Sequence, residues 1–288
     1  MVSTETQVAA ITGAYGYLGA AIRERLEACG WRTLALVRTP RADDGSARRH
    51  CLSEPASAGL LDGVDLLVHC AYDFTLTRPD EVVRVNVEGS RSLLRAASLA
   101  GVSRVITISS MSAYPGTRQV YGRAKLMIES ATEEIGGCVV RPGLVYGESP
   151  GGMVGALRKM VRLPVVPLPA GDLKQYLVHQ DDLTRAVAAL ARAPDPPVGP
   201  TSVAHPTPVP FRTILETLAR RDGRTCRFVA VPWPTCYWPL RLAEMTPLSL
   251  PFRADSLLGL VTTAPSPVGV ERLAGLGVTV RPFVDGTR

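Results

Sequence analysis

The sequence predicts an α/β fold in which a doubly wound parallel sheet is followed by a smaller C-terminal α/β lobe. Up to about residue 145, short apolar runs alternate with helical patterns, which is typical of βαβ units. The apolar runs are nearly continuous in Val, Ile and Leu, as expected for strands covered on both faces. After residue 150 prolines become dense, so we expect a sheet domain at 1–148 and a lobe at 149–288, with 179–205 returning to the sheet domain.

The elements of the sheet domain can be placed in order along the chain. Strands are predicted at 7–13, 32–38, 48–52, 64–71, 103–110 and 137–143. Amphipathic helices are predicted at 17–29, 80–100 and 118–135, each ending near a glycine that suits a left-handed cap. Ligands of open parallel sheets bind at the carboxyl ends of the strands, so the loops at that edge are the first place to look for a site.

Composition excludes several classes of protein. The chain has 288 residues, of which 46% are hydrophobic and 20% charged, as in ordinary globular proteins. Its net charge is +6, but the arginines are scattered without a basic stripe, which argues against a nucleic-acid partner. We expect the excess charge to help attract a small phosphate-bearing ligand.

The six cysteines and the N-terminus bear on the compartment. No C-x-x-C pair and no zinc-like His spacing occurs, so we expect no metal and read the cysteines as reduced thiols of a cytoplasmic protein. The N-terminus lacks a basic signal region, and no apolar run reaches about 18 residues. We therefore expect neither secretion nor a membrane partner.

A glycine motif lies between the first strand and the first helix. In "TGAYGYLG" the glycines are Gly13, Gly16 and Gly19. A tight glycine turn lets the backbone approach a pyrophosphate and points the helix N-terminus at it. We interpret the motif as a dinucleotide site, with a purely structural turn as the alternative.

The residue that ends the second strand predicts which dinucleotide is used. An acidic residue there favours NAD, whereas arginine favours the 2′-phosphate of NADP. Here that residue is Arg38, with Arg41 just beyond. NADP(H) is therefore favoured and NAD(H) is possible, because Arg38 in this arginine-rich chain could also be merely solvated.

Tyr121 and Lys125 lie four residues apart in a predicted helix and so share one face. A cation fixed beside a phenol favours the phenolate and moves the tyrosine pKa toward neutral pH, where it can exchange protons. The pair predicts acid/base chemistry, with an incidental surface pair as the alternative.

Together these motifs resemble the extended short-chain dehydrogenase/reductases, which include nucleotide-sugar epimerases and dehydratases. The resemblance rests on "TGAYGYLG", "DLLVHCA", "NVEGSRSLLRAASLAGVSRVITISS", "YGRAK", "VVRPGLVYG" and "YLVHQDDLTRAVAAL", and it covers roughly residues 7 to 190. It implies a Rossmann-type sheet with a smaller substrate lobe. The chain departs from the family in having only six residues between Tyr114 and Tyr121 and no Asp after the third strand.

By position, the resemblance assigns roles to residues. It makes Tyr121 the catalytic acid/base, Lys125 the residue that binds the nicotinamide ribose and lowers the tyrosine pKa, and Ser110 the hydroxyl that bonds the substrate oxygen. It implies dinucleotide contacts at Gly13, Tyr15, Gly16, Tyr17, Leu18, Gly19, Arg38, Ala71, Tyr121, Lys125, Pro142 and Val145. Tyr72 and Asp73 follow the fourth strand at the ligand edge, so we expect them to contact substrate or the nicotinamide ribose, with a plain turn as the alternative. Ser110 and Ser112 are also expected to contact substrate, and no metal ligands are expected.

These assignments predict hydride transfer between nicotinamide and a ketone or secondary alcohol, by an NADPH-dependent ketoreductase. One alternative is a nucleotide-sugar epimerase or dehydratase that holds NAD tightly. Another is a dinucleotide-binding sensor or scaffold without turnover. By the same resemblance, helices 80–100 and 118–135 could form the interface of a homodimer.

Four further features complete the sequence predictions. His69 and His179 lie in strand-like stretches and are expected to be structural, with "HQDDL" capping a helix. Asn86 is either a plain helix residue or a hydrogen-bonding residue near the site. The aromatic stretch 231–245 is expected to pack the small lobe rather than to form a lid.

Overall fold

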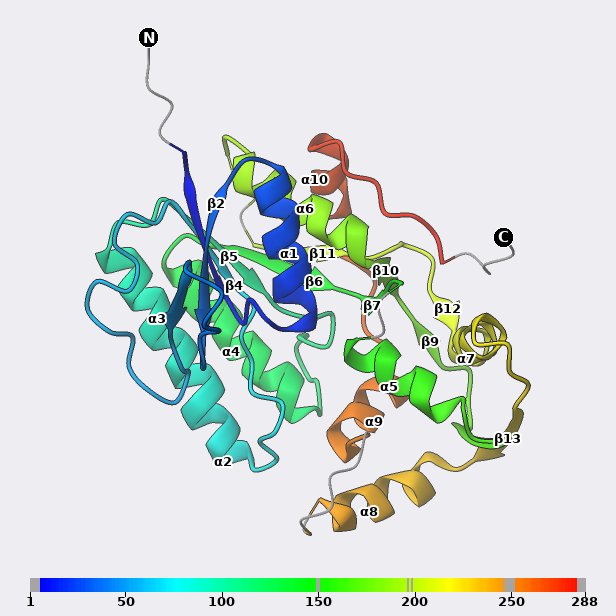
Figure 1. Cartoon of the computed structure of the whole chain (residues 1–288). Coiled ribbons are helices and arrows are strands. Elements are labelled where there is room, and N and C mark those ends of the chain that lie inside the picture. Colours follow the sequence, from blue (N-terminus) through cyan, green and yellow to red (C-terminus); the bar gives the residue numbers. More distant parts are fainter. Residues whose placement is uncertain are drawn as a thin grey trace.

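A seven-stranded sheet forms the centre of the molecule (Figure 1). The computed structural model describes residues 6–148, 151–195, 197, 199–244, 246 and 252–283. The strands of the sheet are β1 (Val8–Thr12), β2 (Arg32–Val37), β3 (Ala47–Arg49), β4 (Leu66–His69), β5 (Arg104–Ile108), β6 (Cys138–Pro142) and β11 (Pro200–Val203). They pair in parallel in the order β11-β6-β5-β4-β1-β2-β3, which confirms the predicted doubly wound sheet. The chain reverses its direction of winding between β1 and β4, the point where such sheets bind ligands.

Helices cover both faces of this sheet. One face carries α1 (Tyr17–Ala28) and α6 (Gln180–Arg192), whose side chains share a core with Ile11 of β1. The other face carries α3 (Glu88–Leu99) and α4 (Val120–Glu134), and side chains of both helices share a second core with Ala10 of β1. Adjacent residues of β1 thus point to opposite cores, as the two-residue period of a strand requires.

The predicted helix 80–100 is not continuous. It consists of α2 (Pro79–Val82), one π-helical turn called η1 (Val83–Val87), and α3. A π turn shifts the hydrogen-bond ladder by one residue, and such turns are frequent at functional sites. Here the turn contains Asn86, which is fully buried.

The C-terminal lobe is assembled from small pieces. Its strands are β7 (Leu144–Tyr146) with β10 (Leu177–His179), β8 (Val165–Pro169) with β13 (Arg227–Val231), and β9 (Lys174–Gln175) with β12 (Val209–Pro210). Its helices are α5 (Gly152–Met160), α7 (Phe211–Arg221), α8 (Trp233–Ala243) and α9 (Ala254–Val261), while α10 (Val270–Gly275) packs near β11. Phe211 and Leu157 lie in its separate core. Between β10 and β12 the chain returns to the large sheet as α6 and β11.

The aromatic stretch 231–245 does not pack as expected. The stretch contains the last residue of β13 and the whole of helix α8. None of the described side chains of α8 is buried, and Trp238 is 67% exposed. The stretch does form a helix of the small lobe, which contacts α9, but the expectation that its aromatic side chains serve as core is wrong, because no described side chain of α8 is buried. We call Trp233, Tyr237 and Trp238 the α8 aromatics. Met245 lies outside the described residues.

Candidate active site

The glycine loop joins β1 to α1 and forms a cradle. Gly13 has a φ of 64°, a left-handed conformation that favours glycine. A Cβ atom on Gly19 would lie only 2.2 Å from the Gly13 carbonyl oxygen, so the loop and the helix can approach this closely only without side chains. Gly16 caps α1 without any side-chain hydrogen bond, which leaves the positive end of the helix open. The loop therefore fits the phosphates of a dinucleotide.

The glycine loop is tied directly to the loop after β4. A Cβ on Gly13 would lie 3.2 Å from the Ala71 Cα atom. Thr12 Oγ1 accepts hydrogen bonds of 3.0 Å from the backbone N–H groups of both Cys70 and Ala71. The structure thus brings the predicted contacts Gly13 and Ala71 together at the switch point of the sheet.

His69 is a structural residue held in one tautomer. Ser90 donates its hydroxyl proton to the Asn86 carbonyl, so it accepts a bond of 2.7 Å from the Nε2–H group of His69. The Nδ1 atom of His69 then accepts from the Thr12 hydroxyl at 2.8 Å. Burial, reinforced by the Lys125 charge, lowers the pKa of His69 to about 3. A buried neutral imidazole bonded on both sides is a link between β1 and the π turn.

Asn86 holds the loop that follows β4. Its Oδ1 atom accepts from the Asp73 N–H at 2.6 Å, and its Nδ2 donates to the Asp73 carbonyl at 3.2 Å. The Asp73 carboxylate accepts from the N–H and hydroxyl of Thr75 and lies 3.6 Å from Arg38 Nη1. Of the two alternatives for Asn86, the structure supports the hydrogen-bonding residue near the site, because its amide fixes the backbone of Asp73. The substrate role of Asp73 stays a prediction.

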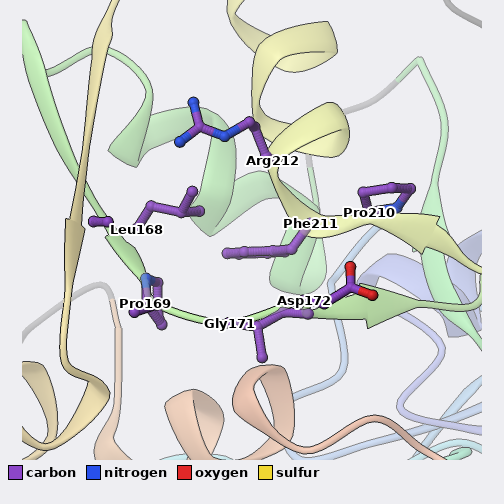
Figure 2. A pocket seen from close by; sticks show the side chains of 10 residues that line it. Leu168, Pro169, Gly171, Asp172, Pro210, Phe211 and Arg212 are labelled. Atoms are coloured by element: carbon purple, nitrogen blue, oxygen red, sulfur yellow. The ribbon is translucent and has the colours of Figure 1, made fainter.

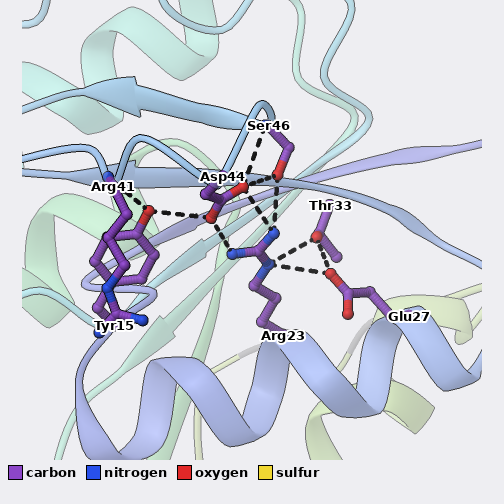
Figure 3. Close-up of polar contacts among 7 residues, drawn as sticks. All are labelled: Tyr15, Arg23, Glu27, Thr33, Arg41, Asp44 and Ser46. Carbon is purple, nitrogen blue, oxygen red and sulfur yellow. Dashed lines mark hydrogen bonds and ion pairs between the residues drawn. The ribbon is translucent and has the colours of Figure 1, made fainter.

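Figure 3 shows the polar network at the outer end of the glycine loop. Arg23 of α1 holds the Asp44 carboxylate, and this bond lowers the pKa of Asp44 well below its usual range. The Tyr15 hydroxyl donates to Asp44 at 3.0 Å, and the Arg41 guanidinium lies 4.2 Å from the centre of the Tyr15 ring. Because the Asp44 carboxylate already bonds to Arg23 and Tyr15, it does not pair with the neighbouring Arg41 guanidinium.

Tyr121 lies in the first turn of α4, close to Ser110 after β5. A Cβ on the next residue, Gly122, would lie 2.3 Å from the Ser112 carbonyl oxygen, so only glycine lets α4 approach the serine turn. The Ser110 hydroxyl lies beside the Tyr121 phenol and acts to lower its pKa. Ser110 Oγ also accepts from the Ser112 N–H at 3.1 Å. The structure thus brings together two of the three predicted catalytic residues.

Lys125 lies one turn further along α4 and is only 3% exposed. Its Nζ donates to the Ile108 carbonyl at 2.8 Å and lies 5.9 Å from the centre of the Tyr121 ring. Burial lowers the pKa of Lys125 to about 8, because a buried ammonium loses hydration. The third predicted catalytic residue therefore lies beside the other two and is still mostly protonated at neutral pH.

The acidity of Tyr121 differs from the sequence expectation. Burial raises the pKa of Tyr121 to about 12, although the neighbouring Ser110 hydroxyl acts in the opposite direction. The expectation that Lys125 brings this pKa down is not met in the ligand-free chain, because the loss of hydration on burial is the largest influence on Tyr121. At neutral pH Tyr121 is therefore a phenol, the form that donates a proton.

Two aromatic rings, those of Tyr72 and Phe74, lie against the Tyr121 phenol. Tyr72 meets Tyr121 edge-to-face with ring centres 5.0 Å apart, and Phe74 lies 4.8 Å from Tyr72 and 5.6 Å from Tyr121. We call these three the site aromatics. Lys125 Nζ lies 5.1 Å from the Tyr72 ring centre. Phe74 is 62% exposed, so it presents an apolar face to solvent beside Tyr121, and sequence reasoning did not single it out.

A buried ion pair lies beneath the catalytic helix. Glu129 accepts from Arg141 Nε at 2.8 Å and from Nη2 at 2.5 Å, and it also accepts from the Ser109 hydroxyl. The sequence analysis missed Glu129, yet a signal was present, because Tyr121, Lys125 and Glu129 recur every four residues and so share one stripe.

The remaining predicted dinucleotide contacts are more dispersed. The Tyr17 ring lies against Gly151, where a Cβ would come within 2.1 Å of it. Leu18 packs against the core, and Pro142 and Val145 lie in β6 and β7 near the same edge of the sheet. The dinucleotide roles of these residues stay predictions.

The second histidine caps a helix, as predicted. His179 Nδ1 accepts from the Asp181 N–H at 3.2 Å at the start of α6, and Asp182 binds Arg281. Within the described ranges, no group of three or more His, Cys, Asp or Glu side chains could hold a metal ion. No helix in the described part of the chain has the length and apolar character needed to cross a membrane.

The lobe contains a cavity of about 330 Å³ (Figure 2). It opens beside the start of α7 and is lined mostly by apolar groups, with Asp172 and Arg212 as its charged residues. The other lining residues are Leu168, Pro169, Ala170, Gly171, Leu173, Pro210, Phe211 and Ala230.

Comparison with known proteins identifies the family. The NAD dependent epimerase/dehydratase family matches residues 9–203. The chain belongs to this family. The family confirms the resemblance drawn from the motifs and the dependence on a nicotinamide dinucleotide.

Individual relatives are more distant. The ceramide reductase of Caulobacter vibrioides is 26% identical over 250 residues, which is 79% of this chain and 74% of that protein. The structure of MoeE5 in complex with UDP-glucuronic acid and NAD has a TM-score of 0.72 at 22% identity, covering 96% of this chain and 95% of that one. DesIV, a dTDP-glucose 4,6-dehydratase from Streptomyces venezuelae with NAD and TYD bound, has a TM-score of 0.69 at 18% identity, covering 97% and 94%. These neighbours carry NAD, so they lend no support to the predicted preference for NADP.

Proposed function

We propose that this chain is a ketoreductase that uses NADPH, with Ser110, Tyr121 and Lys125 as its catalytic set. The observation that carries the proposal is a phenol that lies beside a serine hydroxyl and next to a buried lysine, at the ligand-binding edge of the sheet. A reduction needs a proton donor at neutral pH, and the raised pKa of Tyr121 supplies one.

The chain's own residues divide the work of the reaction. The bound dinucleotide supplies the hydride from its nicotinamide ring. Ser110 and Tyr121 both donate hydrogen bonds to the substrate oxygen, and Tyr121 transfers its proton as the alcohol forms. The Lys125 ammonium, now bonded to the Ile108 carbonyl, is positioned to bind ribose hydroxyls and to stabilise the resulting phenolate.

The surroundings of Tyr121 favour a weakly polar ketone as substrate. Phe74 and Tyr72 line the approach with aromatic surface. The match to a ceramide reductase, whose name describes a lipid substrate, supports the same class.

Arg38 supports the preference for NADPH. It follows the last residue of β2, is 72% exposed at its side chain, and pairs only loosely with Asp73 at 3.6 Å. A 2′-phosphate would offer it two charged oxygens in place of one distant carboxylate. Arg41, stacked on Tyr15, adds a second positive charge nearby.

An epimerase or dehydratase with tightly held NAD is the second candidate. Family membership favours it as much as it favours a reductase, and the neighbour MoeE5 is in complex with UDP-glucuronic acid and NAD. Such an enzyme returns the hydride to its own substrate and so releases no dinucleotide.

One experiment separates the two candidates. The protein is purified without nucleotide and denatured, released dinucleotide is identified by mass spectrometry, and empty protein is titrated with NADPH and NADH. We expect empty protein that binds NADPH more tightly and oxidises it with apolar ketones. Near-stoichiometric bound NAD would instead establish the epimerase or dehydratase.

A pair of arginine variants tests the cofactor assignment. We expect Arg38→Ala to weaken NADPH binding by about tenfold and to leave NADH binding within about twofold. Arg78→Ala is the matched control, because Arg78 is 69% exposed and also pairs with an aspartate, Asp80. Equal loss for both dinucleotides would contradict the role of Arg38.

We also propose a homodimer formed through α3 and α4. Leu99 and Met127 on these helices are exposed apolar side chains. Light scattering after gel filtration measures the mass, and a monomer at micromolar concentration would contradict the proposal.

A further inference from the structure

The start of α9 touches the start of the catalytic helix. Asp255 is the second residue of α9, and its Oδ1 accepts from the Val120 N–H at 2.8 Å. Its Oδ2 accepts from the N–H of Tyr121 itself at 3.1 Å. One carboxylate thus bonds to two of the four free N–H groups at the start of α4.

Among the residues that the structure describes, no other side chain caps α4 in this way. The local cap position is Gln119, whose side chain makes no cap bond and instead donates to the Asp255 carbonyl at 2.8 Å. A Cβ on Gly259, one turn along α9, would lie 2.3 Å from the Gln119 amide nitrogen. The two helices are therefore built to touch, since Gly259 leaves the space that Gln119 fills.

The residue before α9 holds the other side of the site. Arg253 donates to the carbonyl oxygen of Phe74 and, at 2.9 Å, to that of Leu76. Glu244, at the end of α8, accepts from the Ala254 N–H at 2.8 Å. Positions 253 to 255 thereby hold both the loop with the site aromatics and the helix with the catalytic phenol.

We propose that Asp255 is a positioning residue that fixes Tyr121 against Ser110, and that Arg253 fixes Phe74 beside it. The proposal deepens the proposed function and rests on it for the role of Tyr121. Asp255 acts through the backbone N–H of Tyr121 and is not assigned any contact with substrate. Proton transfer depends on the distance between donor and acceptor, so a helix start that drifts lowers turnover more than it lowers binding.

The charged and titratable groups facing Tyr121 come from four elements. Lys125 and Glu129 lie on α4, Ser110 follows β5, Tyr72 follows β4, and Asp255 comes from α9. Burial raises the pKa of Tyr121 most, and the charges of Glu129 and Asp255 add to that rise. Removal of the Asp255 charge is therefore expected to make the phenol more acidic.

Two variants of Asp255 test the proposal in the full-length protein. Asp255→Asn keeps one acceptor oxygen and the side-chain shape, so it is expected to fold, while Asp255→Ala removes both acceptors. Glu271→Gln is the control, because Glu271 is an exposed carboxylate in the first turn of another helix, α10. Circular dichroism and NADPH binding are expected to match the wild type within about twofold for Asp255→Asn and Glu271→Gln.

Turnover of a ketone gives the first readout. We expect kcat to fall by about tenfold in Asp255→Asn and further in Asp255→Ala, with KM changed by less than about threefold. Folded Asp255→Asn with kcat within twofold of the wild type would overturn the proposal. A rise in KM alone would do the same, because it would indicate a binding role.

The second readout needs no substrate, so it remains decisive if the proposed function fails. Phenolate absorbance is titrated in the wild type and in Asp255→Asn, and the curve of the same protein with Tyr121→Phe is subtracted from each. We expect the Tyr121 midpoint to move down by about half a pH unit in Asp255→Asn. An unchanged midpoint would overturn the proposal, whereas a moved midpoint in a protein that reduces no ketone would refute only the ketoreductase.

Discussion

The site aromatics and the α8 aromatics have similar ring geometry and different surroundings. Ring centres are 4.8 to 5.6 Å apart in the first group and 5.4 to 5.8 Å apart in the second. In the first group, the Tyr72 ring lies next to the buried Lys125, and Asn86 holds the backbone of the loop that carries Tyr72 and Phe74. In the second group, none of the described side chains of α8 is buried. The comparison teaches that ring packing does not identify a site, but rings around a buried charge on hydrogen-bonded backbone do.

The largest expected difference comes from the same substitution in both groups. Tyr121→Phe removes the proton donor and is expected to lower kcat by at least about a hundredfold with NADPH binding retained. Tyr237→Phe on α8 is expected to leave kcat within about twofold. Steady-state kinetics with a ketone measures both, and full activity of Tyr121→Phe would establish a non-catalytic dinucleotide binder instead.

The buried lysine gives a pH-dependent difference in stability. The pKa of Lys125 falls from its ordinary 10.5 to about 8 in the fold, so between these values the unfolded chain binds more protons than the native one. Wild-type stability therefore rises across this pH window, and Lys125→Met lacks that rise. We expect the stability advantage of Lys125→Met at pH 7 to shrink by about 2 kcal/mol at pH 10. Urea unfolding at both pH values measures it, and a constant difference would contradict the assigned pKa.

The hydrogen-bonded backbone can be tested at Asn86. Asn86→Ala leaves the N–H and carbonyl of Asp73 without their buried partner and is expected to cost about 1 to 2 kcal/mol of unfolding free energy. Asn86→Asp retains the acceptor for the Asp73 N–H but loses the amide donor. A comparison of the two variants therefore separates the contributions of the two hydrogen bonds that Asn86 makes with the Asp73 backbone. Thermal unfolding provides the measurement, and an unchanged midpoint in Asn86→Ala would show that the loop does not depend on this residue.

The smallest effect concerns two exposed rings. Phe74 and Trp238 are 62% and 67% exposed, so loss of either is expected to change stability by less than about 0.5 kcal/mol. Phe74→Ala is nevertheless expected to raise KM for an apolar ketone by about fivefold, because a lost apolar contact weakens binding by about 1 kcal/mol. Trp238→Ala is expected to leave KM unchanged, and equal effects of the two variants would remove the distinction between the groups.

Local patterns predicted the sheet domain because its signals lie within single elements. The apolar runs, the glycine loop and the Tyr121–Lys125 spacing each depend on neighbours a few residues away. The roles of Asp255 and Arg253 had no such signal, since an aspartate at the start of a helix ordinarily serves its own helix. The acidity of Tyr121 was misjudged for a related reason: burial is set by the packing of Tyr72 and Phe74 around the phenol, which spacing along α4 does not encode.

The bond between Asp255 and the Tyr121 N–H also has a consequence for the time at which the active site becomes complete. The two residues are 134 positions apart, so at typical rates of synthesis the catalytic helix leaves the ribosome roughly 10 to 30 s before its cap. Most strands of the large sheet have been synthesised by then, so the glycine loop between β1 and α1 can form early. The two bonds that hold the start of α4 can therefore form only after residue 255 has been synthesised.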